Sequence, residues 1–144
     1  MKKIKIFLAS SVNEFKNERN MIGDLIRQIQ DKVIDEGIKI NLFECEFFDN
    51  NISAIGRKQE EYNEEIRKSD VFIMLIGSKA GEFTVEEYKV AQKVQGLQRH
   101  IIFKDCDSDE SVIRLKSILS SDDFVYMYKD VIDLKELVST IVYP

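Results

Sequence analysis

Short apolar runs alternate with longer stretches of helical periodicity along the chain. Residues 4–9 are largely apolar and β-branched, which predicts a buried strand. Residues 71–77 form the most apolar run and predict the central strand of a sheet, buried on both faces. Residues 38–43 alternate between apolar and polar positions, so this strand should lie nearer an edge. Two more strands are predicted at 100–103 and 124–128.

Segments with the period of an α-helix separate these strands. Ser11 and Glu14 have the spacing of a capping box, so the first helix should begin there, and Gly37 should end it. Its packing face contains Phe15, Ile22, Leu25, Ile26, Ile29 and Val33. Residues 44–55 lack a clean period and should form a loop. Further helices are predicted at 57–68, 84–97, 111–119 and 134–142.

Five β-α units in succession predict an α/β fold with a parallel sheet and helices on both faces. At 144 residues, these units fit a single domain over 1–144 with the flavodoxin-like strand order 2-1-3-4-5. Ligands of such sheets bind beyond the carboxyl ends of the strands, at the switch point between the first and third strands. This rule selects two loops, 9–13 and 77–83, before any chemistry is considered.

Composition and charge narrow the classes of function. The chain has 44% hydrophobic and 33% charged residues, so it can form a packed core, and its net charge is −5. This charge disfavours binding to nucleic acid or to an anionic membrane. No apolar run approaches the ~20 residues of a membrane span. The apolar stretch after the charged N-terminus is too short for a signal peptide, so we expect a cytoplasmic protein.

Few residues in the sequence can ligate a metal. One histidine, His100, and two cysteines, Cys45 and Cys106, supply too few ligands for a structural zinc site. Both cysteines lie in strand-like stretches, and in a cytoplasmic chain we expect them to be reduced and packed. We therefore expect no metal and no resident cofactor, and any catalysis would rest on carboxylates.

The two switch-point loops carry the candidate binding residues. Ser10 and Ser11 offer hydroxyl groups at a helix start, which can hold a phosphate or a ribose, although Ser11 can also serve only as a cap. In the second loop, Phe83 precedes Glu87 by four residues. Glu87 has capping-box spacing from Thr84, so it can be a simple cap. Alternatively, its carboxylate faces the ligand crevice and stabilises positive charge on a ribose.

Four segments together resemble a bacterial Toll/interleukin-1 receptor (TIR)-like domain of the subgroup associated with prokaryotic defence. They are residues 5–11, 15–19, 69–77 and 86–88, the last followed by Ala91. The resemblance as a whole covers nearly the whole chain in order. The resemblance implies an NAD glycohydrolase or ADP-ribosyl cyclase, which cleaves the nicotinamide–ribose bond.

The resemblance also assigns the site residues. Glu87 takes the position of the family's essential glutamate, with Glu86 as the alternative register. Phe83 takes the aromatic position, where many members have tryptophan, and Ser78 that of a serine before the helix. Residues 47–55, which include Phe47, correspond to a mobile loop that closes the site. NAD is then the substrate, contacted by Ser10, Ser11, Phe47, Ser78 and Phe83.

The resemblance also implies partners, and two other functions remain open. The family assembles into homo-oligomers on activation, with a sensor or effector in another chain or in a further domain. The chain ends just after its last predicted helix, as an excised domain would. One alternative is a non-catalytic TIR module that only self-associates, which suits Glu87 as a cap. The other is an enzyme similar to nucleoside deoxyribosyltransferases, which also carry a glutamate after the third strand but usually have an Asp-x-Gly-Thr-type loop.

Three further charged residues are expected to have structural roles. Glu18 and Arg19 are neighbours in the first helix, and because adjacent residues do not share a helix face, they should form separate ion pairs. Asp70 directly precedes the central strand and should fix the turn that leads into it.

Overall fold

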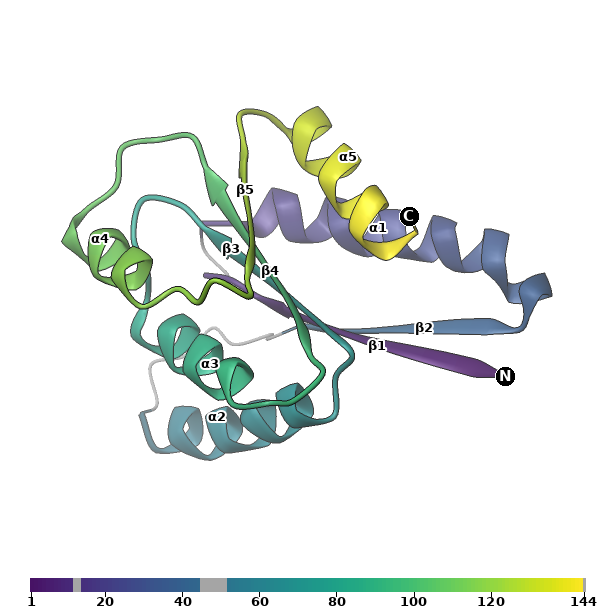
Figure 1. Cartoon of the computed structure of the whole chain (residues 1–144), viewed down its shortest axis with the longest axis horizontal. Helices are drawn as coiled ribbons and strands as arrows, with labels where there is room; N and C mark the ends of the chain where they lie inside the picture. The colour runs from purple at the N-terminus through teal and green to yellow at the C-terminus, as the bar shows by residue number, and fades with distance from the viewer. Residues whose placement is uncertain (12–13, 45–51, 144) are drawn as a thin grey trace.

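Five parallel strands form one sheet with the order β2-β1-β3-β4-β5 in the computed structural model (Figure 1). The structure describes residues 1–11, 14–44 and 52–143, with 52–58 described by their backbone alone. The predicted flavodoxin-like strand order is confirmed, as is the edge position of β2. The strands are β1 (Lys2–Ala9), β2 (Ile38–Glu44), β3 (Val71–Ile76), β4 (Gln98–Lys104) and β5 (Phe124–Tyr128).

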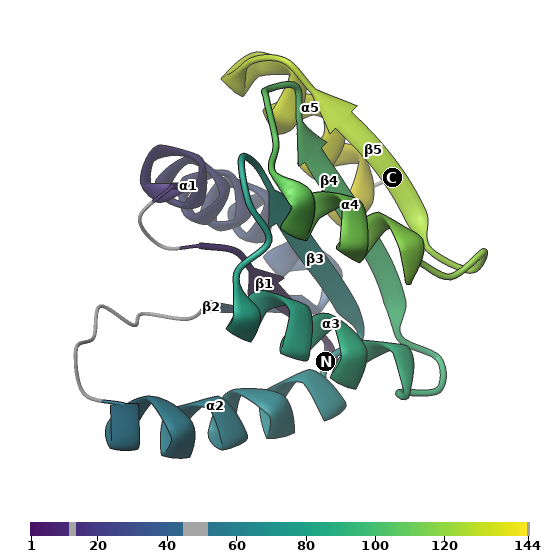
Figure 2. The ribbon, with the colours of Figure 1, turned by 90° about the vertical axis from the view of Figure 1, so that its left-hand side faces the viewer.

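Helices cover both faces of the sheet, as predicted (Figure 2). One face packs against α1 (Lys16–Val33) and α5 (Val131–Val142). The other face packs against α2 (Ile52–Arg67), α3 (Glu82–Gln92) and α4 (Glu110–Ser117). A short 3-10 helix, Ile34–Glu36, follows α1 and ends at Gly37, whose φ of 76° is the left-handed conformation that glycine adopts easily.

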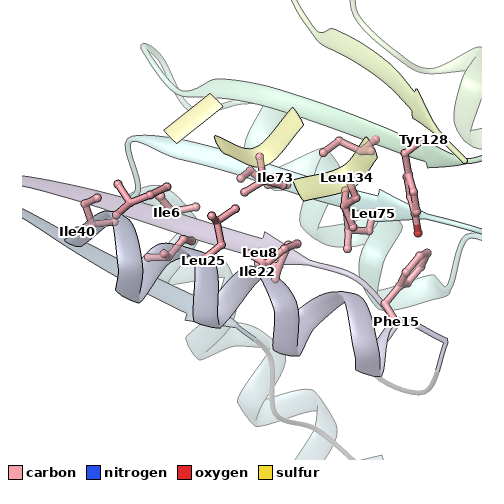
Figure 3. Close-up of a cluster of buried hydrophobic side chains, with 14 of the residues drawn as sticks. Ile6, Leu8, Phe15, Ile22, Leu25, Ile40, Ile73, Leu75, Tyr128 and Leu134 are labelled. Atoms are coloured by element: carbon pink, nitrogen blue, oxygen red, sulfur yellow. The ribbon is translucent and has the colours of Figure 1, made fainter. Parts of the chain in front are cut away.

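Two apolar cores form because alternate residues of each strand point to opposite faces of the sheet. Ile6 and Leu8 of β1 belong to the core under α1 and α5, where they meet Ile22 and Leu25 of α1 (Figure 3). The intervening Phe7 belongs to the core under α2, α3 and α4. Each buried Leu, Ile or Phe side chain contributes about 1.5–3 kcal/mol, so these two cores are the main source of stability.

The β1–β3 pairing brings the two switch-point loops together. Ala9, the last residue of β1, lies opposite Met74 of β3. At the other end of the pair, the Asp70 carboxylate accepts a hydrogen bond from the Lys5 amide at 2.9 Å, and the Asp70 amide donates to the Lys5 carbonyl at 2.8 Å. The predicted structural role of Asp70 is thereby confirmed.

The helix boundaries differ from the predictions. The helix α1 begins at Lys16, with Phe15 as its N-cap, so Ser11 does not cap it. The helix α2 already begins at Ile52, which makes residues 52–55 helical and not part of a loop. The helix α3 runs from Glu82 to Gln92, so it ends five residues before the predicted residue 97, and the chain then turns at Gly96, where φ is 79°. Capping patterns and low helix propensity account for the differences at the helix starts.

Cys106 is exposed and carries a free thiol just after the end of β4, so the expectation that it is packed in a strand is wrong. The strand ends at Lys104, and the next amide, that of Asp105, already bonds to the Tyr128 carbonyl. Cys45 lies outside the described residues. In the described part of the chain, no helix has the length and apolar character that crossing a membrane requires.

Candidate functional site

Glu87 is the most unusual charged residue at the carboxyl edge of the sheet. It lies in the second turn of α3, where its side chain is 3% exposed. Its Oε2 atom is buried and has no hydrogen-bond partner among the described residues. The N-cap of α3 is Gly81, and Thr84 is buried inside the helix, so the predicted Thr84–Glu87 capping box is wrong. Glu87 therefore has no capping role that would explain its burial.

The surroundings of Glu87 change its acidity. Burial raises the pKa of Glu87 from 4.5 to about 8, because a buried carboxylate loses its hydration. A hydrogen bond from the Gln59 side chain and the positive charge of Arg19 lower the pKa, whereas the negative charge of Glu86 raises it further. The carboxyl group is therefore mostly protonated at neutral pH. It becomes ionised only in weakly alkaline solution or when a positive charge is placed beside it.

Arg19 connects three elements at this edge. It is buried in the first turn of α1, where Nη1 donates to the Ser10 hydroxyl at 3.4 Å. Its Nη2 lies 3.5 Å from Oε2 of Glu44, the last residue of β2. Its positive charge also acts on Glu87 of α3. We call the group of Ser10, Arg19, Glu44, Gln59 and Glu87 the edge cluster.

Glu18 is adjacent to Arg19 but has different partners. Its Oε2 accepts a hydrogen bond from the Tyr128 hydroxyl at 2.9 Å and lies 3.7 Å from the Lys104 ammonium. The prediction that Glu18 and Arg19 form separate ion pairs is thus confirmed. Only Arg19 belongs to the edge cluster, while Glu18 ties α1 to β4 and β5.

Glu86 and Glu87 differ sharply in environment. Glu86 is exposed, and its Oε2 accepts a hydrogen bond from Nδ2 of Asn63 at 3.0 Å. Asn63 in turn accepts from Gln59 at 2.9 Å, which links α2 to α3. Glu86 also lines a groove of about 790 Å³ between α3 and α4, whereas Glu87 does not. The sequence left open whether Glu86 or Glu87 takes the position of the family's glutamate. Of these two residues, only Glu87 is buried beside Gln59 and Arg19.

The loop after β3 is held by Glu14. The Ser78 amide donates to Oε1 of Glu14 at 2.5 Å, and the Ser78 carbonyl accepts from the Asp109 amide at 2.9 Å. A Cβ atom at Gly77 would overlap the Glu14 carboxylate in this position, so glycine permits the close approach. The Ser11 hydroxyl accepts from the Glu14 amide at 3.5 Å, which fixes the turn before α1 instead of capping the helix itself.

The remaining predicted binding residues are less closely associated. Phe83 lies in the first turn of α3 and is 41% exposed, so its ring is available at the surface. Ser78 is also exposed. Phe47 lies outside the described residues, as do residues 48–51 of the expected site-closing loop. Among the described residues, no group of three or more His, Cys, Asp and Glu side chains is arranged to hold a metal ion.

Sequence reasoning did not assign Glu44, Gln59 or Glu14 to this region. Glu44 and Gln59 come from β2 and α2, and neither has a motif spacing to Glu87. Their common position at the carboxyl edge of the sheet is the only signal that relates them, and it requires the strand order and helix bounds to be known.

Comparisons with known proteins bear on the fold. No family profile and no curated sequence matches the chain. Among solved structures, a fragment of a candidate lipoprotein from Peptoclostridium difficile 630 has a TM-score of 0.55 and 17% identity, and the match covers 99% of this chain and 97% of that one. A candidate pilus assembly protein (CpaE) from Burkholderia thailandensis E264 has a TM-score of 0.49 and 9% identity, with 98% and 99% covered. A candidate quinone reductase from Klebsiella pneumoniae has a TM-score of 0.48 and 10% identity, with 97% and 85% covered. At such identity, the first likeness concerns the fold alone.

Proposed function

We propose that this chain is a TIR-like enzyme that cleaves the nicotinamide–ribose bond of NAD, with Glu87 as its catalytic carboxylate. The observation that carries the proposal is the buried Oε2 atom of Glu87, which has no hydrogen-bond partner among the described residues. Leaving a buried polar group unpaired costs about 1–3 kcal/mol, and more for a charged group. Such a cost is understandable where the group interacts with a ligand, and buried carboxyl groups with raised pKa values are typical of functional sites.

The proposed reaction is dissociative. The bond between C1′ of the ribose and N1 of nicotinamide breaks, and its electron pair moves to the pyridinium nitrogen, so neutral nicotinamide leaves. Positive charge then develops on C1′ and the ring oxygen of the ribose, as in glycoside hydrolysis. Water adds to C1′ and loses a proton to give ADP-ribose, or a ring nitrogen of the adenine adds instead and gives a cyclic product.

Glu87 suits the charge that develops in this reaction. An ionised carboxylate in a buried setting stabilises a nearby cation far more strongly than it would in water. The approaching pyridinium and the oxocarbenium-like ring favour the ionised form of Glu87, because an opposite charge lowers the pKa of a carboxyl group. The hydrogen bond from Gln59 and the positive charge of Arg19 also favour the ionised form. The pyridinium leaving group is already activated, so the step needs no additional acid.

The other residues of the proposal bind the substrate. Ser10 directly follows β1 and belongs to the edge cluster through its hydrogen bond from Arg19, and we assign its hydroxyl to a ribose hydroxyl of the substrate. The exposed ring of Phe83 is available to stack on nicotinamide. Ser11 joins this set because it lies in the first switch-point loop, and Ser78 and Phe47 join it on the resemblance. Assembly into homo-oligomers and a role in anti-phage defence also belong to this proposal on the resemblance, and a cytoplasmic location is proposed with them.

A second enzymatic candidate shares the carrying observation. In an enzyme similar to nucleoside deoxyribosyltransferases, the buried Glu87 carboxylate would act on the N-ribosyl bond of a nucleoside. The non-catalytic signalling module was favoured by a capping role of Glu87, and the N-cap of α3 is Gly81 instead. We therefore rank NAD cleavage first, the nucleoside reaction second and the signalling module third.

A substrate panel separates these candidates. The protein, concentrated and in the presence of a crowding agent because such enzymes act as assemblies, is incubated with NAD, or with a deoxynucleoside and a free base. The proposal predicts release of nicotinamide from NAD and no base exchange. Base exchange without nicotinamide release would instead support the second candidate, and neither product under crowded conditions would support the signalling module.

A further inference from the structure

Glu14 accepts a hydrogen bond from a backbone amide at the switch point of the sheet. Its carboxylate accepts from the Ser78 amide at 2.5 Å and lies over Gly77, in the loop that follows β3. The switch point, between the ends of β1 and β3, is where sheets of this type bind their ligands. In this structure, a negatively charged group of the protein itself fills that position.

The local geometry is suited to an anion. A charge-assisted bond from a backbone amide to a carboxylate is short and strong, and a phosphate oxygen is an acceptor of the same charge. Gly77 leaves space beside the Ser78 amide that any side chain would fill, since a Cβ there would overlap the Glu14 carboxylate and approach the Phe15 ring. The same space would admit a phosphate group once the Glu14 side chain had moved.

Glu14 is also free to move without disturbing a helix. It lies in the turn before α1, which begins at Lys16. Its backbone is held separately, because the Glu14 amide donates to the Ser11 hydroxyl and the Phe15 amide donates to the Ser11 carbonyl. Rotation of the Glu14 side chain alone would therefore release the Ser78 amide.

We propose that the Ser78 amide and Gly77 form a subsite for a phosphate group of the substrate, and that Glu14 competes with this phosphate for the same donor. The identification of the ligand as the diphosphate of a dinucleotide rests on the proposed function. The competition itself rests on the contact between Glu14 and Ser78. Glu14 thereby sets a threshold for binding, because the substrate must displace a like charge from the subsite.

The test is binding of inorganic pyrophosphate, and separately of NAD, to the wild-type protein and to Glu14→Ala, measured by isothermal titration calorimetry. The control is Glu110→Ala, which removes a side chain of the same charge from the first turn of α4, where Glu110 is more exposed than Glu14. We expect Glu14→Ala to bind pyrophosphate at least ten-fold more tightly than the wild type, Glu14→Gln to show an intermediate gain, and Glu110→Ala to remain within two-fold of the wild type. Equal affinities of Glu14→Ala and the wild type would overturn the proposal.

A second measurement keeps the test decisive if Glu14→Ala folds poorly. In the wild-type protein, the amide resonance of Ser78 should shift on titration with pyrophosphate, and an unshifted resonance at saturation would overturn the subsite. Neither readout depends on turnover. Tighter pyrophosphate binding by Glu14→Ala without any nicotinamide release would uphold the subsite and reject NAD cleavage, whereas nicotinamide release with unchanged affinities would do the reverse.

Discussion

Replacing Glu87 by glutamine should stabilise the protein, by an amount that grows with pH. The pKa of Glu87 is about 8 in the folded chain and 4.5 when the group is hydrated as in the unfolded chain. Below pH 4.5 the carboxyl group is protonated in both states and has no effect on the pH dependence. Between pH 4.5 and 8 the unfolded chain releases the proton while the folded chain retains it, so rising pH favours unfolding.

The size of this effect follows from the two pKa values. Each pH unit between them corresponds to about 1.4 kcal/mol, so the full penalty above pH 8 is roughly 5 kcal/mol. About 3 kcal/mol of it is already present at pH 7. Glutamine has a similar shape and cannot ionise, so Glu87→Gln removes the penalty while retaining the contact with Gln59.

The assay is urea unfolding of wild type and Glu87→Gln at pH 5, 6, 7, 8 and 9. The difference in unfolding free energy should increase steadily with pH and level off near pH 8. Glu86→Gln is the control, because Glu86 is exposed one residue earlier on the same helix and its curve should run parallel to that of the wild type. A difference between Glu87→Gln and wild type that stays constant from pH 5 to 9 would refute the argument from burial.

Three further predictions concern single residues. Asp70→Ala removes the acceptor of the Lys5 amide and should lower the free energy of unfolding by about 1–2 kcal/mol in urea titrations, and an unchanged urea midpoint would contradict this role. Gly77→Ala should displace the Glu14 side chain and break its bond to the Ser78 amide, which lowers the free energy of unfolding by about 1 kcal/mol in urea titrations, and the loss should shrink in the Glu14→Ala background; an equal loss in both backgrounds would rule out that contact. Phe83→Ala should leave the melting temperature nearly unchanged, because the ring is exposed, and should raise the KM for NAD several-fold. A lower melting temperature with the same KM would show that the ring contributes only to packing.

The strands were predictable because a strand that is buried on both faces consists almost entirely of apolar residues. All residues of β3 after Val71 are buried, and the segment is correspondingly apolar from end to end. The edge strand β2 has one buried residue, Ile40, and its sequence alternates between apolar and polar positions from Ile38 to Leu42. With five β-α units identified, the requirement for short, right-handed crossovers left few strand orders to consider, and the flavodoxin-like order was one of them.

The helix starts were harder to predict because caps need not involve side chains. The pair Thr84 and Glu87 has the spacing of a capping box, yet α3 begins almost a turn earlier than this pair suggests. Its first residue is Glu82, and its N-cap is Gly81, which has no side chain to form a cap. The first turn of α2 contains Ser53 and, shortly after, Gly56, which have low helix propensity, so its sequence did not indicate a helix.

The edge cluster could be predicted only in part. Resemblance pointed to Glu87, and the position of Ser10 followed from the switch-point rule. Arg19 was expected to form an ion pair, but its partners were not predictable, because Glu44 and Glu87 come from β2 and α3 and meet only through the strand order. The contact between Glu14 and Ser78 joins residues 64 positions apart and likewise leaves no local pattern.

The pH dependence of nicotinamide release from NAD joins the geometry of Glu87 to the proposed chemistry. Because kcat/KM reports the ionisation of the free enzyme, its value for the wild type should rise from pH 6, reach half of its maximum near pH 8, where Glu87 is half ionised, and approach its plateau near pH 9. Glu87→Gln should release no nicotinamide above background, and Glu86→Gln should retain the wild-type profile. A wild-type kcat/KM that is constant from pH 6 to 9, or release by Glu87→Gln at the wild-type rate, would contradict the assignment of Glu87 as the catalytic carboxylate.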